Sequence, residues 1–199
     1  MVKVTISAGN SKMGPIKSIS LPPIKTCRKC GCWSECYANR YCKIRKTVRE
    51  SYENNLHAYL FNEDEYWREI EKVIKTSKFF RFHVAGDIPD YKYMCKMIVL
   101  AVQNPECEML CFTKRHEYVN AALNGIKLPK NLHIILSFWS DYTPENPHNL
   151  PTAHVKYKDG TTTASENAKE CKGNCMECAL TIGGCWTLKN GEEIVFKKH

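Results

Sequence analysis

The sequence has no apolar run long enough to cross a bilayer, and its first residues lack the long apolar segment of a secretory signal peptide. It also has no internal repeat and no low-complexity tract, which excludes solenoid and fibrous architectures. These absences predict a protein of the reducing cytoplasm with no membrane partner. In that compartment cysteines bind metals or act in catalysis more often than they form disulfides.

The composition is that of a soluble globular protein, with 43% hydrophobic and 25% charged residues in a chain of 199. The formal net charge of +8 suggests a nucleic-acid partner. The basic residues are spread along the chain, however, and thiolates bound to a metal would cancel part of the excess. A solvated positive face therefore explains the charge better than a dedicated nucleic-acid groove.

Strand-like and helix-like segments alternate in the middle of the chain. Apolar segments predict strands at 79–84, 108–113 and 132–138, with helices between them at 89–103 and 116–123. This rhythm is typical of parallel βαβ units. The sequence predicts five further elements: a strand at 2–8, helices at 35–60 and 62–76, and short strands at 155–157 and 193–196.

Too many residues lie in loops for a complete eight-stranded barrel, which needs roughly 200 residues or more. We therefore expect an α/β fold, either an incomplete (βα) barrel or an open parallel sheet. Residues 1–150 would form the α/β domain, and residues 151–199 would form a cysteine-rich, metal-binding extension packed on it. Asn62 and Glu65 resemble a capping box at the start of the second helix.

The sequence is rich in cysteine, with twelve in the chain and most of them in two clusters. The N-terminal thiol group comprises Cys27, Cys30, Cys32 and Cys36. The C-terminal thiol quartet comprises Cys171, Cys175, Cys178 and Cys185. Cys42 falls inside the predicted helix and is expected to be a spare. Thiols packed this closely predict a metal site at each cluster.

The quartet spans fifteen residues, and glycines between its members allow the backbone to wrap around one centre. Compact runs of this kind hold iron–sulfur clusters, with the fourth ligand somewhat further along. Zinc prefers two separated pairs, and Cys27, Cys30, Cys175 and Cys178 could supply them. The spacing favours a 4Fe-4S cluster on the quartet and leaves zinc as the alternative.

The N-terminal thiol group precedes a predicted helix, where the helix dipole stabilises negative charge. It also lies at the predicted mouth of a parallel sheet, which is where α/β proteins bind ligands. His83, Asp87, Lys114, Arg115 and Asp141 fall at or just beyond predicted strand ends, at the same rim. Among these, Asp87 could bind a substrate amine and Lys114 or Arg115 an anionic group, while His83 is expected to point into the core.

Four segments resemble the phage gene product 88 family: the NSKMG run near the start, Cys36-Tyr37-Ala38, the stretch from Phe80 to Asp87, and Phe112 to Arg115. The similarity covers most of the chain, including the terminal cysteines. It implies a phage- or prophage-encoded protein in the cytoplasm of a host cell.

More distantly, the layout resembles that of the radical S-adenosylmethionine enzymes. This resemblance implies a 4Fe-4S cluster on the N-terminal thiol group, with S-adenosylmethionine on its open iron. It also implies cofactor contacts from Gly86, Asp87 and Tyr37. The cysteine register departs from that family, whose spacing would place ligands at Lys29 and Trp33.

Together these features predict an iron–sulfur protein with two clusters. A first hypothesis makes it a radical S-adenosylmethionine-like enzyme with Asp87, Lys114 and Arg115 as catalytic residues. It would act on a small molecule or nucleic acid and receive electrons from a donor. The alternative is a non-enzymatic zinc or iron–sulfur binding module that contacts nucleic acid or a phage assembly.

Overall fold

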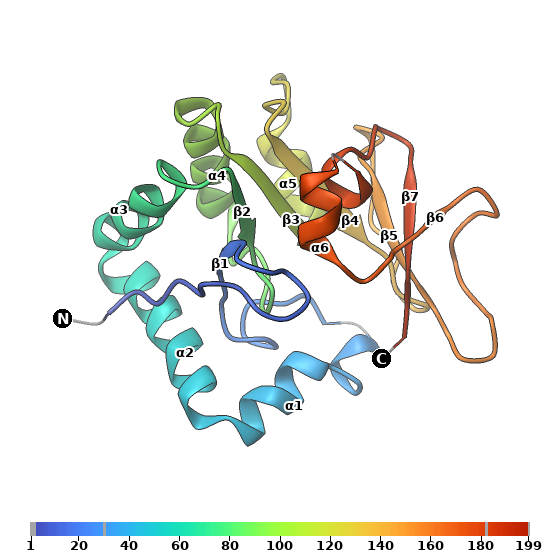
Figure 1. Cartoon of the computed structure of the whole chain (residues 1–199), viewed down its shortest axis with the longest axis horizontal. Coiled ribbons are helices and arrows are strands. Elements are labelled where there is room, and N and C mark those ends of the chain that lie inside the picture. The colour runs from blue at the N-terminus through green and yellow to red at the C-terminus, as the bar shows by residue number, and fades with distance from the viewer. Residues whose placement is uncertain (1–2, 30, 182, 199) are drawn as a thin grey trace.

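The computed structural model describes residues 3–29, 31–181 and 183–198, and it contains one seven-stranded sheet. The strands are β1 (Lys17–Ile19), β2 (Phe79–Phe82), β3 (Glu108–Thr113), β4 (Leu132–Ser137), β5 (Thr152–Lys156), β6 (Lys169–Glu170) and β7 (Glu193–Lys197). Their order is β1-β2-β3-β4-β5-β7-β6, and every neighbouring pair is parallel. The sheet is open, which confirms the α/β class with an open parallel sheet (Figure 1).

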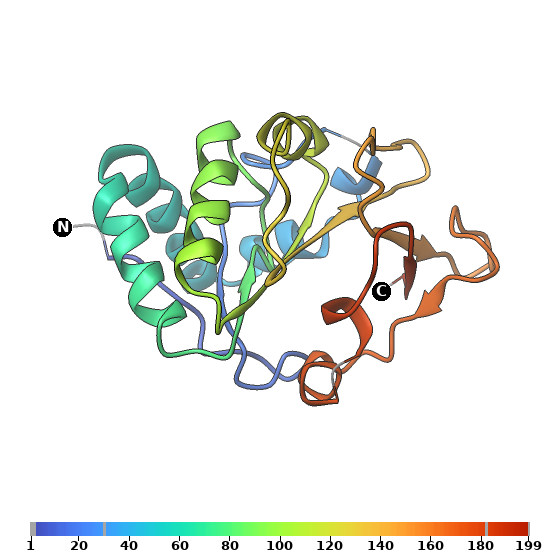
Figure 2. The same cartoon turned by 90° about the horizontal axis from the view of Figure 1, so that it is seen from above.

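Most helices cover one face of this sheet. The helices are α1 (Tyr37–Ile44), α2 (Lys46–Phe61), α3 (Glu63–Ile74), α4 (Tyr91–Gln103), α5 (His116–Ala122) and α6 (Cys175–Leu180), with short 3₁₀ turns η1 (Gly31–Trp33) and η2 (Gly184–Trp186). Right-handed crossovers between sequential parallel strands place their helices on the same side. Helices α3, α4 and α5 accordingly lie in a row, while α6 is separate from them (Figure 2).

The alternation of side chains along each strand divides the core in two. Phe80 and Phe82 of β2 point to the helices and belong to the larger hydrophobic cluster. Phe79 of β2 and Leu110 of β3 belong instead to a smaller cluster on the opposite face, which is called the inner face below. The cysteines of the quartet pack against this smaller cluster. The inner face is therefore the side of the sheet on which thiols gather.

Two predictions about the N-terminal third are wrong. The described residues of the segment 2–8 form no strand, only an isolated antiparallel bridge between Ser7 and Ser18. The edge strand is β1, because residues 17–19 pair in parallel with β2. The predicted helix at 35–60 is two helices, because Arg45 adopts an extended backbone (φ −108°, ψ 96°) between α1 and α2.

The elements of the middle of the chain match their predicted positions closely. Helix α3 starts after Asn62 as predicted, but the Asn62 side chain makes no capping hydrogen bond, so the capping box is wrong. The boundary expected after residue 150 falls between β4 and β5, and β5, β7 and β6 continue the same sheet. Within the described residues, no helix is both long and apolar enough to cross a membrane.

Candidate functional site

A cavity of about 740 Å³ lies on the inner face of the sheet. Its walls come from the inward side chains of β2, β3, β5 and β7 and from the loop after β4. All four cysteines of the quartet line it, as do Tyr37, Lys114 and Trp139. The cavity thus connects the C-terminal quartet with residues at the rim that the sequence singled out.

Backbone hydrogen bonds to distant parts of the chain position the quartet. The Cys171 N–H donates to the Val195 carbonyl (2.9 Å), and the Cys175 N–H donates to the Lys12 carbonyl (3.0 Å). Helix α6 is capped by Asn174, whose side chain accepts from the Glu177 N–H (3.0 Å). These bonds fix the ends of the segment against β7 and the N-terminal loop.

The chain then turns tightly over one of the thiols. Gly184 has a φ of +58°, and a Cβ at this position would lie 2.8 Å from Cys178 Sγ. Glycine is needed here both for the left-handed backbone and for the close approach to sulfur. The glycines of the cysteine run therefore let η2 fold back onto α6, which brings Cys185 to the same cavity as Cys178.

The quartet consists of free thiols that are each partly buried. Burial raises the pKa of Cys185 to about 12, the other three thiols of the quartet raise it too, and Arg81 lowers it. Burial and the neighbouring thiols also raise the pKa of Cys178. As described, no set of three or more His, Cys, Asp or Glu side chains is arranged so that it could hold a metal ion.

The N-terminal thiol group lies at the other end of the strands. Cys27 is close enough to Asp87 and Cys36 for both to raise its pKa, which burial chiefly brings to about 12. Cys36 is the N-cap of α1, and its Sγ accepts from the Asn39 N–H (3.4 Å). Cys32 lies in η1, whereas Cys30 lies outside the described residues.

Polar contacts hold the loop of the N-terminal thiol group against the rim of the sheet. The Gly31 N–H donates to Asp141 Oδ2 (2.7 Å), and Arg28 pairs with Glu117 (3.4 Å). The Tyr37 hydroxyl donates to the Val84 carbonyl (2.9 Å), just beyond β2. Asp141, which the sequence placed at this rim, therefore anchors the cysteine loop. Cys42 is buried in α1, as expected for a cysteine outside the group.

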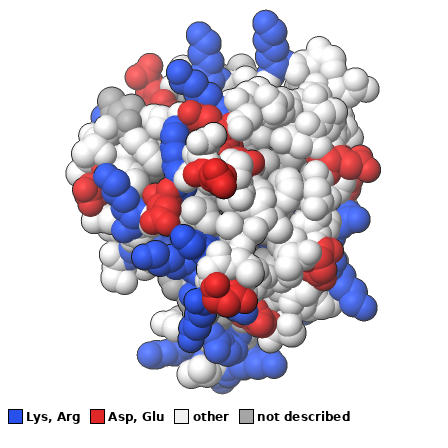
Figure 3. Space-filling model, turned by 90° about the vertical axis from the view of Figure 1, so that its right-hand side faces the viewer, with Lys and Arg blue, Asp and Glu red and all other residues white. Residues whose placement is uncertain are grey.

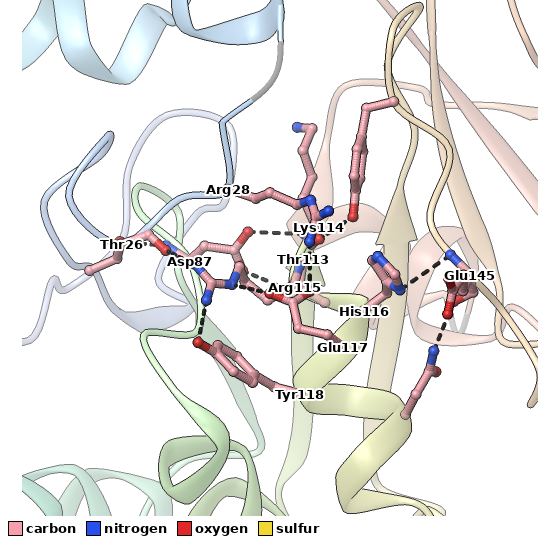
Figure 4. Close-up of polar contacts among 12 residues, drawn as sticks. Thr26, Arg28, Asp87, Thr113, Lys114, Arg115, His116, Glu117, Tyr118 and Glu145 are labelled. Atoms are coloured by element: carbon pink, nitrogen blue, oxygen red, sulfur yellow. Dashed lines mark hydrogen bonds and ion pairs between the residues drawn. The ribbon is translucent and has the colours of Figure 1, made fainter.

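Asp87 is buried and joins the ends of β2 and β3 (Figure 4). Its Oδ1 accepts from the Thr113 hydroxyl (2.5 Å) and the Ile88 N–H (2.8 Å), and its Oδ2 accepts from the Lys114 N–H (2.9 Å). Burial raises the pKa of Asp87, and these hydrogen bonds oppose the rise. A carboxylate has about four acceptor positions, so three donors leave one on Oδ2.

The other residues predicted at the rim, Gly86, Lys114 and Arg115, have different surroundings. Gly86 has a φ of +79°, and a Cβ there would lie 2.5 Å from the Leu21 carbonyl oxygen, so glycine lets the chain pass close to β1. Lys114 Nζ lies over the Trp139 ring (5.6 Å) at the cavity. Arg115 instead contacts Glu117 (2.8 Å) and Tyr118, away from the cavity lining (Figure 4).

The two thiol groups are separated along the strands. Trp186, next to Cys185, packs on Phe79 at the start of β2, whereas Cys27 lies near Asp87 beyond the end of β2. Helices α6 and α1 accordingly lie apart in Figure 1, with α1 along the lower edge and α6 higher, beside β4. The described members of the zinc alternative, Cys27, Cys175 and Cys178, thus belong to different ends of the sheet.

Sequence reasoning missed Arg81, which lines the cavity between the two groups. Its charge lowers the pKa of both Tyr37 and Cys185. The available signal was a lone charged residue in the apolar strand FFRF. His83, in contrast, is buried as expected, with its Nε2 3.1 Å from the Tyr93 hydroxyl.

The fold and site define a cysteine-rich α/β protein with an open parallel sheet and a thiol-lined cavity on its inner face. The family model for gene product 88 matches residues 3–183, so the chain belongs to this phage protein family. That match confirms the family resemblance seen in the sequence. Searches of curated proteins and of solved structures found no match.

Proposed function

We propose that this protein is an iron–sulfur protein with one 4Fe-4S cluster on the C-terminal quartet and a second on the N-terminal thiol group. The observation that carries the proposal is the gathering of four free thiols at one apolar cavity. Thiols placed this close repel one another once ionised, and burial adds to the cost. A bound metal would compensate both, because thiolates are its ligands and its charge offsets theirs.

The donors fit such clusters in number and kind, but the described thiols do not converge on one centre, so binding would require their side chains to draw together. Four cysteines are the usual ligand set of a 4Fe-4S cluster, and thiolates also suit zinc. The separation of the two groups supports two sites rather than one mixed zinc site. The quartet has four thiols for one centre, which suits a closed cluster that relays electrons from a donor or stiffens the C-terminal segment.

The N-terminal thiol group supports the enzymatic version of the proposal. A 4Fe-4S cluster with an open iron supplies the electron that cleaves S-adenosylmethionine reductively in the radical enzymes that the layout resembles. In this chain the remaining acceptor position on Asp87 would receive the amino group of that cofactor. Gly86 and Tyr37 would shape the site, and Lys114 would face a substrate in the cavity.

Metal analysis of protein purified anaerobically tests this proposal. We expect iron and acid-labile sulfide in equal amounts, with about half of both lost in Cys178→Ser and the other half in Cys36→Ser. Cys95→Ser is the matched control, because Cys95 lies on α4 outside both groups. Colourless protein with stoichiometric zinc and no sulfide would overturn the proposal. A change in the EPR spectrum of the reduced protein on adding S-adenosylmethionine would support the enzyme, and an unchanged spectrum would contradict it.

A second candidate function is a zinc or iron–sulfur module that binds nucleic acid or a phage assembly. It is favoured by the corner between α1 and α2, where five basic side chains are exposed: Arg40, Lys43, Arg45, Lys46 and Arg49. Tyr41 and Ile44 are exposed beside them, and an exposed ring beside cations suits nucleic-acid bases and phosphates.

Acidic and basic side chains are intermixed over other parts of the surface. On the face in Figure 3, basic groups crowd at the lower end, while acidic groups are interspersed over the middle. If the corner binds nucleic acid, changing Arg45 and Arg49 to Gln should weaken binding of a single-stranded oligonucleotide and reduce its salt dependence. Unchanged binding of the double variant would exclude this function for the corner.

A further inference from the structure

Arg81 is a charged residue in the middle of an otherwise apolar strand. Its neighbours in β2, Phe80 and Phe82, point to the helices, so Arg81 points to the inner face and lines the cavity there. Its Nε is buried and has no hydrogen-bond partner. Among the described residues, no carboxylate lies within ion-pair distance of its guanidinium.

The contacts that Arg81 does make are weak. Its guanidinium lies over the Phe112 ring (5.0 Å to the centroid), and its Nη1 lies 3.8 Å from Met13 Sδ. Neither contact supplies an acceptor for the buried Nε, while the residue as a whole is only half-buried and lines the cavity. Arginines in such positions are usually paired with a carboxylate or phosphate, which their planar fork can bind with two hydrogen bonds. Arg81 therefore offers a position for an anion in the cavity, whose own described carboxylates, Glu35, Glu170 and Glu177, make no ion pair with it.

The surroundings of Arg81 define the rest of the ligand. Aromatic side chains from three parts of the chain line the same cavity: Phe112, Phe138, Trp139 and Phe196. Two lysines also line it, each over one of these rings: Lys12 over Phe196 and Lys114 over Trp139 (both 5.6 Å). Flat apolar walls with cations near them suit a ligand that has a planar ring and a negative group. The volume of about 740 Å³ is ample for a small molecule of nucleotide size.

We propose that the inner cavity binds a nucleoside monophosphate, with the phosphate on Arg81 and the base against the aromatic wall. This site shares its cavity with the quartet, whose four thiols line it too, but the contacts proposed for the monophosphate do not require a metal on those thiols. The rival explanation is that Arg81 only offsets thiolate charge on the quartet, since it lowers the pKa of Cys185. The two explanations differ in what a change at Arg81 affects, which is ligand affinity in one and metal content in the other.

Calorimetric titration of the full chain, as purified anaerobically, tests the proposal with adenosine monophosphate and adenosine as probes. We expect saturable binding of the monophosphate and binding of adenosine about tenfold or more weaker, because adenosine lacks the group that pairs with Arg81. Arg81→Gln should weaken the monophosphate about tenfold or more and bring it level with adenosine, while Arg81→Lys should retain part of the preference. Arg68→Gln is the control, because Arg68 is exposed on α3 away from the cavity lining, and it should bind like the native protein.

Three outcomes would overturn the proposal. They are equal affinities for the two probes, no saturable binding of the monophosphate, and an Arg81→Gln variant with native affinity. Iron and sulfide are measured on the same samples, so that loss of metal in Arg81→Gln with unchanged affinity assigns Arg81 to the quartet. If Arg81→Gln does not fold, the comparison rests on the native protein and Arg81→Lys. Failure of the metal proposal is read separately, from the metal content of the native protein.

Discussion

The two thiol groups are similar in composition and different in surroundings. The quartet comes from the end of β6, the short helix α6 and the 3₁₀ turn η2, and it packs against the smaller hydrophobic cluster toward the N-terminal end of β2. The N-terminal thiol group lies at the C-terminal ends of the strands, near the buried carboxylate of Asp87 and the hydroxyl of Tyr37. Parallel sheets bind ligands at the C-terminal ends of their strands. Under the proposed function, this difference would give the quartet a supporting role and the N-terminal thiols the chemistry.

The backbones at the two ends should also differ in how much they tolerate change. A Cβ at Gly86 would lie 2.5 Å from the Leu21 carbonyl oxygen, which is backbone, whereas a Cβ at Gly184 would meet the Cys178 side chain. We expect Gly86→Ala to lower the free energy of unfolding by about 3 kcal/mol, because β1 must shift and the residue has a positive φ. Gly184→Ala should cost about 1–2 kcal/mol, since a thiol can rotate away.

Chemical denaturation measures both values, with Gly160→Ala as the control. Gly160 also has a positive φ (+89°), but a Cβ there meets nothing within 4 Å, so its cost reports the backbone conformation alone. We expect about 1 kcal/mol for this control. Gly86→Ala and Gly160→Ala variants of equal stability would show that the contact with Leu21 imposes no constraint on the site.

The region at the C-terminal ends of the strands should be the acid-sensitive part of the molecule. His83 is buried next to Tyr93 just beyond β2, and burial lowers its pKa to about 3. The unfolded state binds a proton near pH 6.5, so the stability from neutral His83 is present above that pH and is lost as the pH falls toward 3. The loss is about 1.4 kcal/mol per pH unit, or roughly 2 kcal/mol at pH 5.

Replacing His83 by Asn removes this titration, and Asn tolerates the positive φ of the position (+56°). The variant will be less stable at pH 7, but its free energy of unfolding should fall less steeply between pH 6.5 and pH 5 than that of the native protein. Denaturation series at each pH measure the two slopes. Parallel slopes would mean that His83 does not titrate on unfolding in this range.

The sequence predicted the middle of the sheet well because β2, β3 and β4 are short apolar runs with helices between them. It failed at β1 because Lys17–Ile19 is three residues long, and its pairing with β2 depends on contacts far along the chain. Within the candidate site, sequence position brought Asp87 to the strand rim, but Thr113 and the Lys114 N–H, which hold its carboxylate, come from the next strand. Only the parallel pairing of β2 with β3 places these groups together.

Arg81 shows a second limit of prediction from sequence. Its alternation with Phe80 and Phe82 predicts the face on which it lies, but not that this face is a cavity. The cavity exists because β5 and β7 extend the sheet and α6 closes over its inner face. Those elements lie in the last fifty residues, where short strands and clustered cysteines give weak periodic patterns. The anion position is therefore a product of tertiary structure rather than of a sequence motif.

The smallest expected effect concerns the contact that ties the C-terminal strand to the N-terminal thiol loop. Lys198 follows β7, and its Nζ lies 2.7 Å from Glu35 Oε2 and 4.6 Å from the centroid of the Tyr157 ring. Both side chains of the ion pair are partly exposed, so we expect Lys198→Gln to lower the free energy of unfolding by only about 0.5 kcal/mol. A double-mutant cycle with Glu35→Gln isolates the pair, and its coupling should shrink at high salt because exposed charges are screened. A coupling of about 2 kcal/mol or more would show that the C-terminal strand and the N-terminal thiol loop are held together more tightly than a surface ion pair allows.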